Sequence, residues 1–243
     1  MSPTDSTRTP RFDAATADQR PLSSQPATPL KPRLRGWLHA GTFPLVLLGG
    51  VVLVGIAPTT PARVGAAIFT ATAALLFGTS AVFHLGTWTG RVHGVLRRLD
   101  HSNIFLIIAG SYTPFALLLL PADQARSLLT IVWLGALGGV LFRVLWVGAP
   151  RWLYTPIYVA LGWVAVFYFG PMLAGGGPVV MSLLVVGGVL YTLGAVVYGT
   201  KRPNPSPRWF GFHEVFHACT VAAFVVHFVA IALAASGSSP AAA

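Results

Sequence analysis

The sequence predicts an all-α integral membrane protein, a bundle of seven transmembrane helices with the N-terminus inside and the C-terminus outside. Hydrophobic residues make up 54% of the 243 residues and charged residues 9%, which excludes an ordinary soluble domain. Seven apolar stretches each approach the roughly 20 residues that a helix needs to cross the hydrocarbon layer. The basic residues, in addition, fall mostly on one side of the predicted bundle.

The apolar stretches are nearly free of charge and are joined by short loops, so they are expected to form one membrane domain over residues 36–235. A transmembrane barrel would instead show shorter segments of alternating polarity. Gly110–Pro114 is predicted to interrupt the third stretch, either as a kink or as a polar lining to a cavity. Gly175–Pro178 is predicted to form a tight outer turn before the sixth stretch. The predicted helices cover residues 37–57, 64–85, 102–120, 127–147, 152–173, 179–198 and 212–234.

The formal net charge of +10 is a topology signal. Of the 16 Lys and Arg residues, 14 fall on one side: they lie in the N-terminal tail, in the second, fourth and sixth loops or, for Arg143, near the end of the fourth stretch. Basic residues collect on the cytoplasmic side of membrane proteins, so the N-terminus is placed inside and the protein in the plasma (inner) membrane. Anionic lipid headgroups are therefore the expected partner of this charge, and nucleic acid is not.

The chain ends are expected to lack structure. Residues 1–35 form a polar tail, rich in Ser, Thr and Pro, that ends in the basic cluster Lys31–Arg35. Its composition predicts disorder and does not match a cleaved signal peptide. Residues 236–243 are small and polar, and we expect a second disordered tail there. Cys219 is the only cysteine, so no disulfide within the chain is expected.

Polar residues in the apolar part of the chain concentrate in three clusters. Ionisable groups at membrane depth are costly and usually functional. With the N-terminus inside, the second helix ends, and the third and seventh begin, on the cytoplasmic side. All three clusters are therefore expected at the same end of the bundle. They are Ser80–His84, Leu99–His101 and His213–His217.

The spacing of these residues suggests a metal site. His213 and His217 are four residues apart, hence on one helix face, and two such imidazoles can bind Zn²⁺. His84 would supply a third ligand and leave a coordination position open, which is typical of catalytic rather than structural zinc. Asp100 is the candidate to orient or deprotonate water, and Ser80 to hydrogen-bond either the substrate oxygen or Asp100.

Alternatives remain for several residues. The string His213–His217 also matches the H-E-x-x-H motif of zinc peptidases, with Glu214 as the base. No acidic residue follows Glu214, however, and His227 lies too far along the helix to share a metal with His217. Glu214 is then expected to face the headgroups. His101 is interpreted either as a partner of the site or as a helix-start residue.

The other histidines are not expected to bind a metal. We expect His39 and His93 to be interfacial residues that bond to backbone carbonyls. His227 is expected to lie deep in the bilayer, as a buried hydrogen-bonding group or as part of a substrate or proton path, and not as a metal ligand.

These motifs together resemble the hemolysin III family, the bacterial branch of the progestin and adipoQ receptor superfamily. The resemblance covers about residues 36–235 and includes S-x-x-x-H (Ser80, His84) and H-x-x-x-H (His213, His217). It also includes the run from Leu99 to Pro114, whereas Phe83 stands where many members have Tyr. The resemblance implies seven helices and Zn²⁺ held by the three histidines, with Ser80 and Asp100 close by.

The leading functional hypothesis is a zinc-dependent membrane hydrolase of a lipid amide or ester, with a role in membrane lipid homeostasis. The resemblance contributes the chemistry, because relatives in the wider superfamily include lipid-amide hydrolases and receptors with ceramidase-like activity. Two alternatives stay open: a sensor or receptor without enzymatic activity that contains structural zinc, and a membrane-disrupting hemolysin.

Overall fold

The computed structural model describes residues 31–237, and the expectations for residues 1–30 and 238–243 lie outside this part of the chain. Residues 31–237 form seven α-helices and one 3₁₀-helix, and they contain no β-strand. The helices are α1 (Trp37–Ile56), α2 (Thr60–Leu85), α3 (Gly90–Leu119), α4 (Ala122–Leu145), α5 (Arg151–Gly162), η1 (Val164–Tyr168), α6 (Phe169–Thr200) and α7 (Phe212–Gly237). The all-helical prediction is confirmed.

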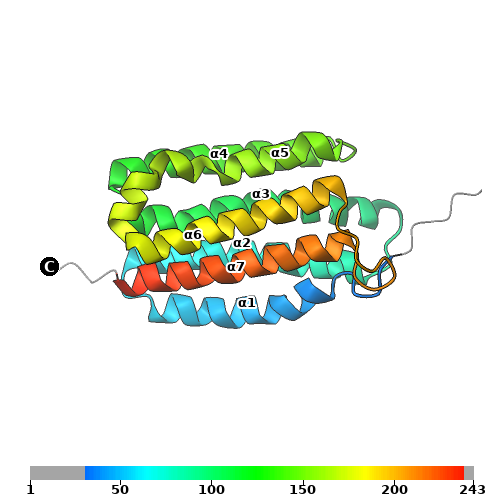
Figure 1. Cartoon of the computed structure of the whole chain (residues 1–243), viewed down its shortest axis with the longest axis horizontal. Coiled ribbons are helices and arrows are strands. Elements are labelled where there is room, and N and C mark those ends of the chain that lie inside the picture. Colours follow the sequence, from blue (N-terminus) through cyan, green and yellow to red (C-terminus); the bar gives the residue numbers. More distant parts are fainter. Residues whose placement is uncertain (1–30, 238–243) are drawn as a thin grey trace, which may run out of the picture. The chain divides into compact units, whose positions relative to one another are not determined.

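Six helical segments of the described chain are long and apolar enough to cross a membrane. Five of them are α1, α2, α3, α4 and α7, whereas the sixth, Arg151–Thr200, combines α5, η1 and α6. The predicted turn at residues 175–178 is present only as a break in α6, where Gly177 has a φ of 70° and Pro178 follows. Glycine adopts this positive φ without a steric penalty. Figure 1 shows the chain running along the bundle in α5, turning, and returning in α6.

Helix α3 differs most from its predicted extent. It begins at Gly90 rather than at residue 102, so Asp100 and His101 lie well inside the helix and not at its start. The helix continues without a break through residues 110–114 to Leu119, so they do not interrupt it, whereas Ser111 and Tyr112 do line a cavity of the bundle. Gly110 serves packing instead, since a Cβ there would contact the side chain of Thr72 on α2.

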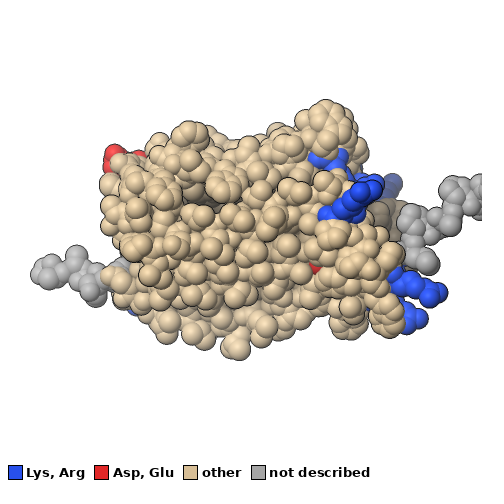
Figure 2. Space-filling model, viewed as in Figure 1, with Lys and Arg blue, Asp and Glu red and all other residues tan. Residues whose placement is uncertain are grey.

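Consecutive helices pack against one another, α1 on α2, α2 on α3 and α3 on α4, and α7 closes the bundle against α6 and α1. Helix α2 begins at an N-cap in which Thr59 Oγ1 accepts a hydrogen bond of 3.3 Å from the Ala62 N–H. Aromatic side chains such as Phe69, Phe77 and Phe105 fill the core. Figure 2 shows that the described Lys and Arg residues gather mainly at one end, where α6 ends and α7 begins.

Candidate metal centre

Three histidines meet at this basic end of the bundle. His84 lies in the last turn of α2, and His213 and His217 lie in the first two turns of α7. One ring nitrogen from each lies within 4.8 Å of the others, so the group has the spacing to hold a metal ion. His84 Nε2 and His213 Nε2 are 3.1 Å apart, close to the about 3.3 Å that tetrahedral zinc with Zn–N bonds of 2.0–2.1 Å requires.

The chemistry of the donors also fits a metal. His84 and His217 are buried, and His213 is partly buried. His217 Nδ1 has no hydrogen-bond partner within the described structure. Imidazole nitrogens suit Zn²⁺ and neighbouring transition metals. Three protein ligands from one side leave room for a further ligand.

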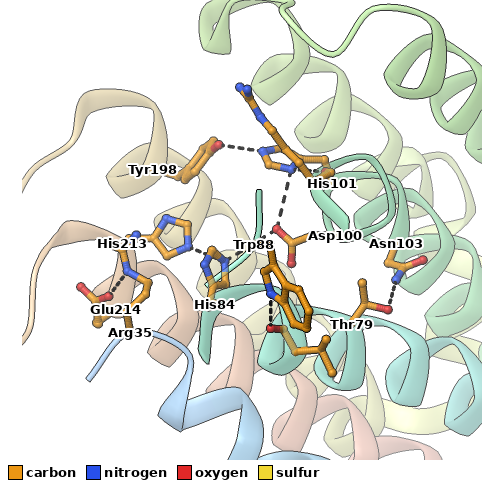
Figure 3. Close-up of polar contacts among 12 residues, drawn as sticks. Arg35, Thr79, His84, Trp88, Asp100, His101, Asn103, Tyr198, His213 and Glu214 are labelled. Carbon is orange, nitrogen blue, oxygen red and sulfur yellow. Dashed lines mark hydrogen bonds and ion pairs between the residues drawn. The ribbon is translucent and has the colours of Figure 1, made fainter. Parts of the chain in front are cut away.

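Asp100 stands beside this histidine group. Its Oδ2 lies 3.7 Å from His84 Nε2 and 3.7 Å from His101 Nδ1. Ser80, one helical turn before His84, lies close enough to the Asp100 carboxylate to interact with it. In Figure 3, His84 lies between His213 and Asp100. The carboxylate is thus positioned next to the group rather than among its three candidate ligands.

His101 contacts Asp100 from α3 and is held by its own network. Its Nδ1 donates to the Arg97 carbonyl at 2.8 Å, and its Nε2 lies 3.3 Å from the Tyr198 hydroxyl. The Tyr198 hydroxyl is in turn 2.9 Å from that of Tyr154. Both ring nitrogens of His101 are therefore engaged, which favours its interpretation as a partner of the site. The alternative role at the start of a helix is wrong, because α3 begins eleven residues earlier, at Gly90.

Glu214 faces away from the three ligand nitrogens. Its side chain is 1% exposed and forms an ion pair with Arg35, which precedes α1. Its Oε2 also accepts a hydrogen bond of 2.7 Å from the Gly211 N–H, just before α7. The expectation that Glu214 faces the headgroups is wrong. The carboxylate instead fixes the start of the helix that carries His213 and His217.

His39 is the participant that the sequence missed. It comes from α1, is 2% exposed, and stacks face to face on His217 with ring centroids 3.7 Å apart and an interplanar angle of 14°. Phe77 contacts it edge-on at 4.9 Å. His39 is therefore packed inside the bundle against His217 rather than exposed at its surface. The only signal in the sequence was a histidine at the correct end of the first helix.

Two hollows adjoin the histidine group. A cavity of about 360 Å³ extends into the bundle and is lined mainly by apolar side chains of α3, α5, α6 and α7. His213, His217, Ser80 and Asp100 line it at the metal-centre end. A more open and more polar pocket of about 300 Å³ is lined by His84 and by basic residues that include Lys31, Arg35 and His93. The group therefore lies between an apolar interior and a polar, basic end.

Fold and site together define a multi-pass integral membrane protein with a cluster of three histidines at one end of its helical bundle. The family model described as "Haemolysin-III related" matches residues 27–228. The chain belongs to this family, which confirms the resemblance seen in the motifs.

Curated relatives agree with this assignment. The chain is 36% identical over 146 residues to the Hemolysin-3 homolog of Bacillus subtilis (strain 168), a match that covers 60% of this chain and 68% of the relative. It is 38% identical over 111 residues to Hemolysin-3 of Bacillus cereus, covering 44% and 49%. It is 27% identical over 186 residues to Progestin and adipoQ receptor-like protein 1 of Caenorhabditis elegans, covering 67% and 42%. The last two matches thus span half or less of the relatives' own length.

Proposed function

We propose that this protein is a zinc-dependent hydrolase that cleaves an amide or ester bond of a membrane lipid. The observation that carries the proposal is the placement of three histidines, with ligand atoms within 4.8 Å, beside a carboxylate and at the end of an apolar cavity. A hydrocarbon chain fits the apolar cavity, and a polar headgroup fits the open basic pocket. The bond between chain and headgroup would then lie at the metal.

Each residue has a role in this proposal. A zinc ion held by His84, His213 and His217 would supply Lewis acidity, polarising a carbonyl group and increasing the acidity of water. Asp100 accepts the proton of a water that attacks the carbonyl carbon, and returns it to the nitrogen or oxygen that leaves. Ser80 holds the Asp100 carboxylate through the contact between the two side chains. The products are a fatty acid and an amine or alcohol.

We also propose seven membrane crossings with the N-terminus in the cytoplasm. Arg151–Thr200 has 50 residues, which as one helix would extend about 75 Å, whereas the hydrocarbon layer is about 30 Å thick. The break at Gly177 and the reversal of direction between α5 and α6 support two crossings there. The basic end of the bundle supports the orientation. Reaction of cysteines introduced in the loops with an impermeant reagent tests this topology.

Metal analysis tests the site. Purified wild-type protein is expected to contain about one zinc per chain, and His84→Ala to contain little. His93→Ala is the matched control, because His93 is exposed and lies outside the three-histidine group. Absence of stoichiometric zinc, or full retention of zinc by His84→Ala, would disprove the assignment of the ligands.

Turnover of lipid amides and esters tests the chemistry. Asp100→Asn is expected to lower kcat by about 10²- to 10⁴-fold, the usual contribution of general acid–base catalysis. Asp123→Asn is the control, since Asp123 is exposed in the first turn of α4 and away from the histidines. A wild-type protein that turns over no lipid of the panel above the background of empty membranes contradicts the hydrolase.

A receptor with structural zinc is the second candidate. It is favoured by the fact that His84 lies on α2 and the other two histidines on α7, so a metal would clasp two helices that are distant in the sequence. Removal of the metal would then lower the thermal stability strongly, and no lipid would be turned over under any condition.

A further inference from the structure

The cavity contains unused hydrogen-bonding capacity away from the histidine group. Tyr191 on α6 and His227 on α7 both line it, and the Tyr191 hydroxyl and His227 Nδ1 are buried with no hydrogen-bond partner in the described structure. Buried polar atoms nearly always find a partner, either in the protein, in water or in a ligand. The two atoms therefore indicate that something polar binds in this otherwise apolar part of the cavity.

The hydrogen bond that His227 makes within the protein determines whether its other ring nitrogen can donate or accept. His227 is 7% exposed, and its Nε2 lies 3.2 Å from the Leu184 carbonyl oxygen. Because a carbonyl only accepts, Nε2 is the donor, and Nδ1 of the neutral ring is left as an acceptor. A partner for Nδ1 must therefore bring an O–H or N–H group.

Tyr191 complements this acceptor. The centroids of its ring and of the His227 ring are 5.6 Å apart, and its hydroxyl can donate or accept. Phe115 packs against His227 edge-on, also with centroids 5.6 Å apart, and provides an apolar wall. Gly187 makes room for the imidazole, since a Cβ at this position would overlap the His227 ring. An acceptor and a group that can donate are thus carried by two neighbouring rings that line the same cavity.

The distance between the metal centre and His227 follows from their positions on α7. His227 lies ten residues after His217 on α7, which corresponds to about 15 Å. Both residues line the same cavity. A molecule whose polar end is at the histidine group can therefore extend through the cavity to the Tyr191–His227 pair.

We propose that the cavity binds a long-chain lipid with a hydroxyl group about 15 Å from its metal-facing end, and that His227 and Tyr191 recognise this hydroxyl. His227 Nδ1 accepts the hydroxyl proton, and the Tyr191 O–H donates to the hydroxyl oxygen. A keto or ether oxygen makes only the second bond, because it has no proton to give. The inference rests on the proposed function for the position of the lipid's polar end.

Binding of matched fatty acids to the full-length, zinc-loaded protein tests the proposal. The acids have the same chain length and differ only in the position of one hydroxyl group, and the unsubstituted acid is included. Displacement of a fluorescent fatty acid gives the affinities. The acid whose hydroxyl is about 15 Å from the carboxylate is expected to bind about three- to tenfold more tightly than the others, which corresponds to one or two net hydrogen bonds.

Two variants assign the preference to residues on different helices. Tyr191→Phe removes the hydroxyl, and His227→Leu removes both ring nitrogens, so that the Nδ1 acceptor is lost together with the hydrogen bond to the Leu184 carbonyl. Each variant is expected to lose part of the positional preference and to bind the unsubstituted acid with the affinity of the wild type, a result that also shows that it is folded. Tyr168→Phe is the control, because its hydroxyl contacts Ser127 and it does not line the cavity.

The outcomes separate this inference from the proposed function. Equal affinity of the wild type for all the acids overturns the hydroxyl site and leaves water as the partner of the pair, while the lipid cavity stands. A positional preference that is as large in both variants as in the wild type also overturns it. If no acid binds at all, the lipid part of the proposed function fails together with the inference, whereas the zinc content still tests the metal centre separately.

Discussion

Replacement of Arg35 by Ala is predicted to destabilise the protein more than replacement of Glu214 by Gln, although the two residues form one ion pair. Their burial is unequal: the Glu214 side chain is 1% exposed and that of Arg35 is 20% exposed. Arg35→Ala leaves a buried carboxylate whose remaining partner is the Gly211 N–H. Removal of one partner of a buried pair costs about 3–5 kcal/mol.

Glu214→Gln removes the buried charge together with the ion pair. The amide oxygen can still accept from Gly211, and the partly exposed Arg35 can turn to water. We therefore expect a cost of about 1–2 kcal/mol, the loss of one charge-assisted hydrogen bond. At about 2–4 °C per kcal/mol for a chain of this size, Tm falls by about 10 °C in Arg35→Ala and by a few degrees in Glu214→Gln.

Thermal unfolding in detergent, followed by tryptophan fluorescence, measures this difference, and the zinc content is measured on the same samples. Glu214→Gln is expected to keep its zinc, because the carboxylate faces Arg35 and Gly211 rather than the ligand nitrogens. An equal or larger loss of Tm in Glu214→Gln would refute the argument from burial. Loss of all turnover with zinc retained would favour Glu214 as the base of a peptidase-like mechanism.

Two further substitutions test the packing around the cavity and the histidines. Gly187→Ala is expected to lower the free energy of unfolding by about 1–3 kcal/mol, because the added Cβ overlaps the His227 ring. Gly188→Ala is the control, since its Cβ meets open space and should leave Tm unchanged. Similar Tm values for the two variants would contradict the close approach of α6 and α7. His39→Ala removes the ring stacked on His217 and is expected to lower zinc affinity by about tenfold or more, as loss of an orienting partner does. His39→Phe keeps the stack and should restore most of the affinity in a chelator competition, and unchanged affinity in His39→Ala would show that the stack does not orient His217.

Much of the architecture could be predicted from local pattern. The apolar stretches identified the helices because each must satisfy its backbone hydrogen bonds internally in the membrane. The boundaries were less reliable where packing overrides composition. Helix α3 begins at Gly90, in a stretch with three arginines that composition assigned to a loop. Pro114 lies inside α3, where α2 packs closely against it at Gly65.

The candidate site followed from residue type together with topology. The i, i+4 spacing of His213 and His217, together with the position of His84 at the end of the second helix, predicts three imidazoles at one end of the bundle. The roles of Glu214 and His39 did not follow. Their partners, Arg35 and His217, are 179 and 178 residues away in the chain, and no local pattern encodes such contacts.

The sequence by itself determined the class of protein, the helices and the histidines of the candidate metal centre, because hydropathy, charge asymmetry and helical spacing are local properties of the chain. Only the tertiary structure decided which side chains meet. It brought His39 onto His217, turned Glu214 toward Arg35, and set Tyr191 beside His227 along one apolar cavity. These contacts depend on how α1, α6 and α7 pack, and that packing is a property of the whole bundle rather than of any single helix.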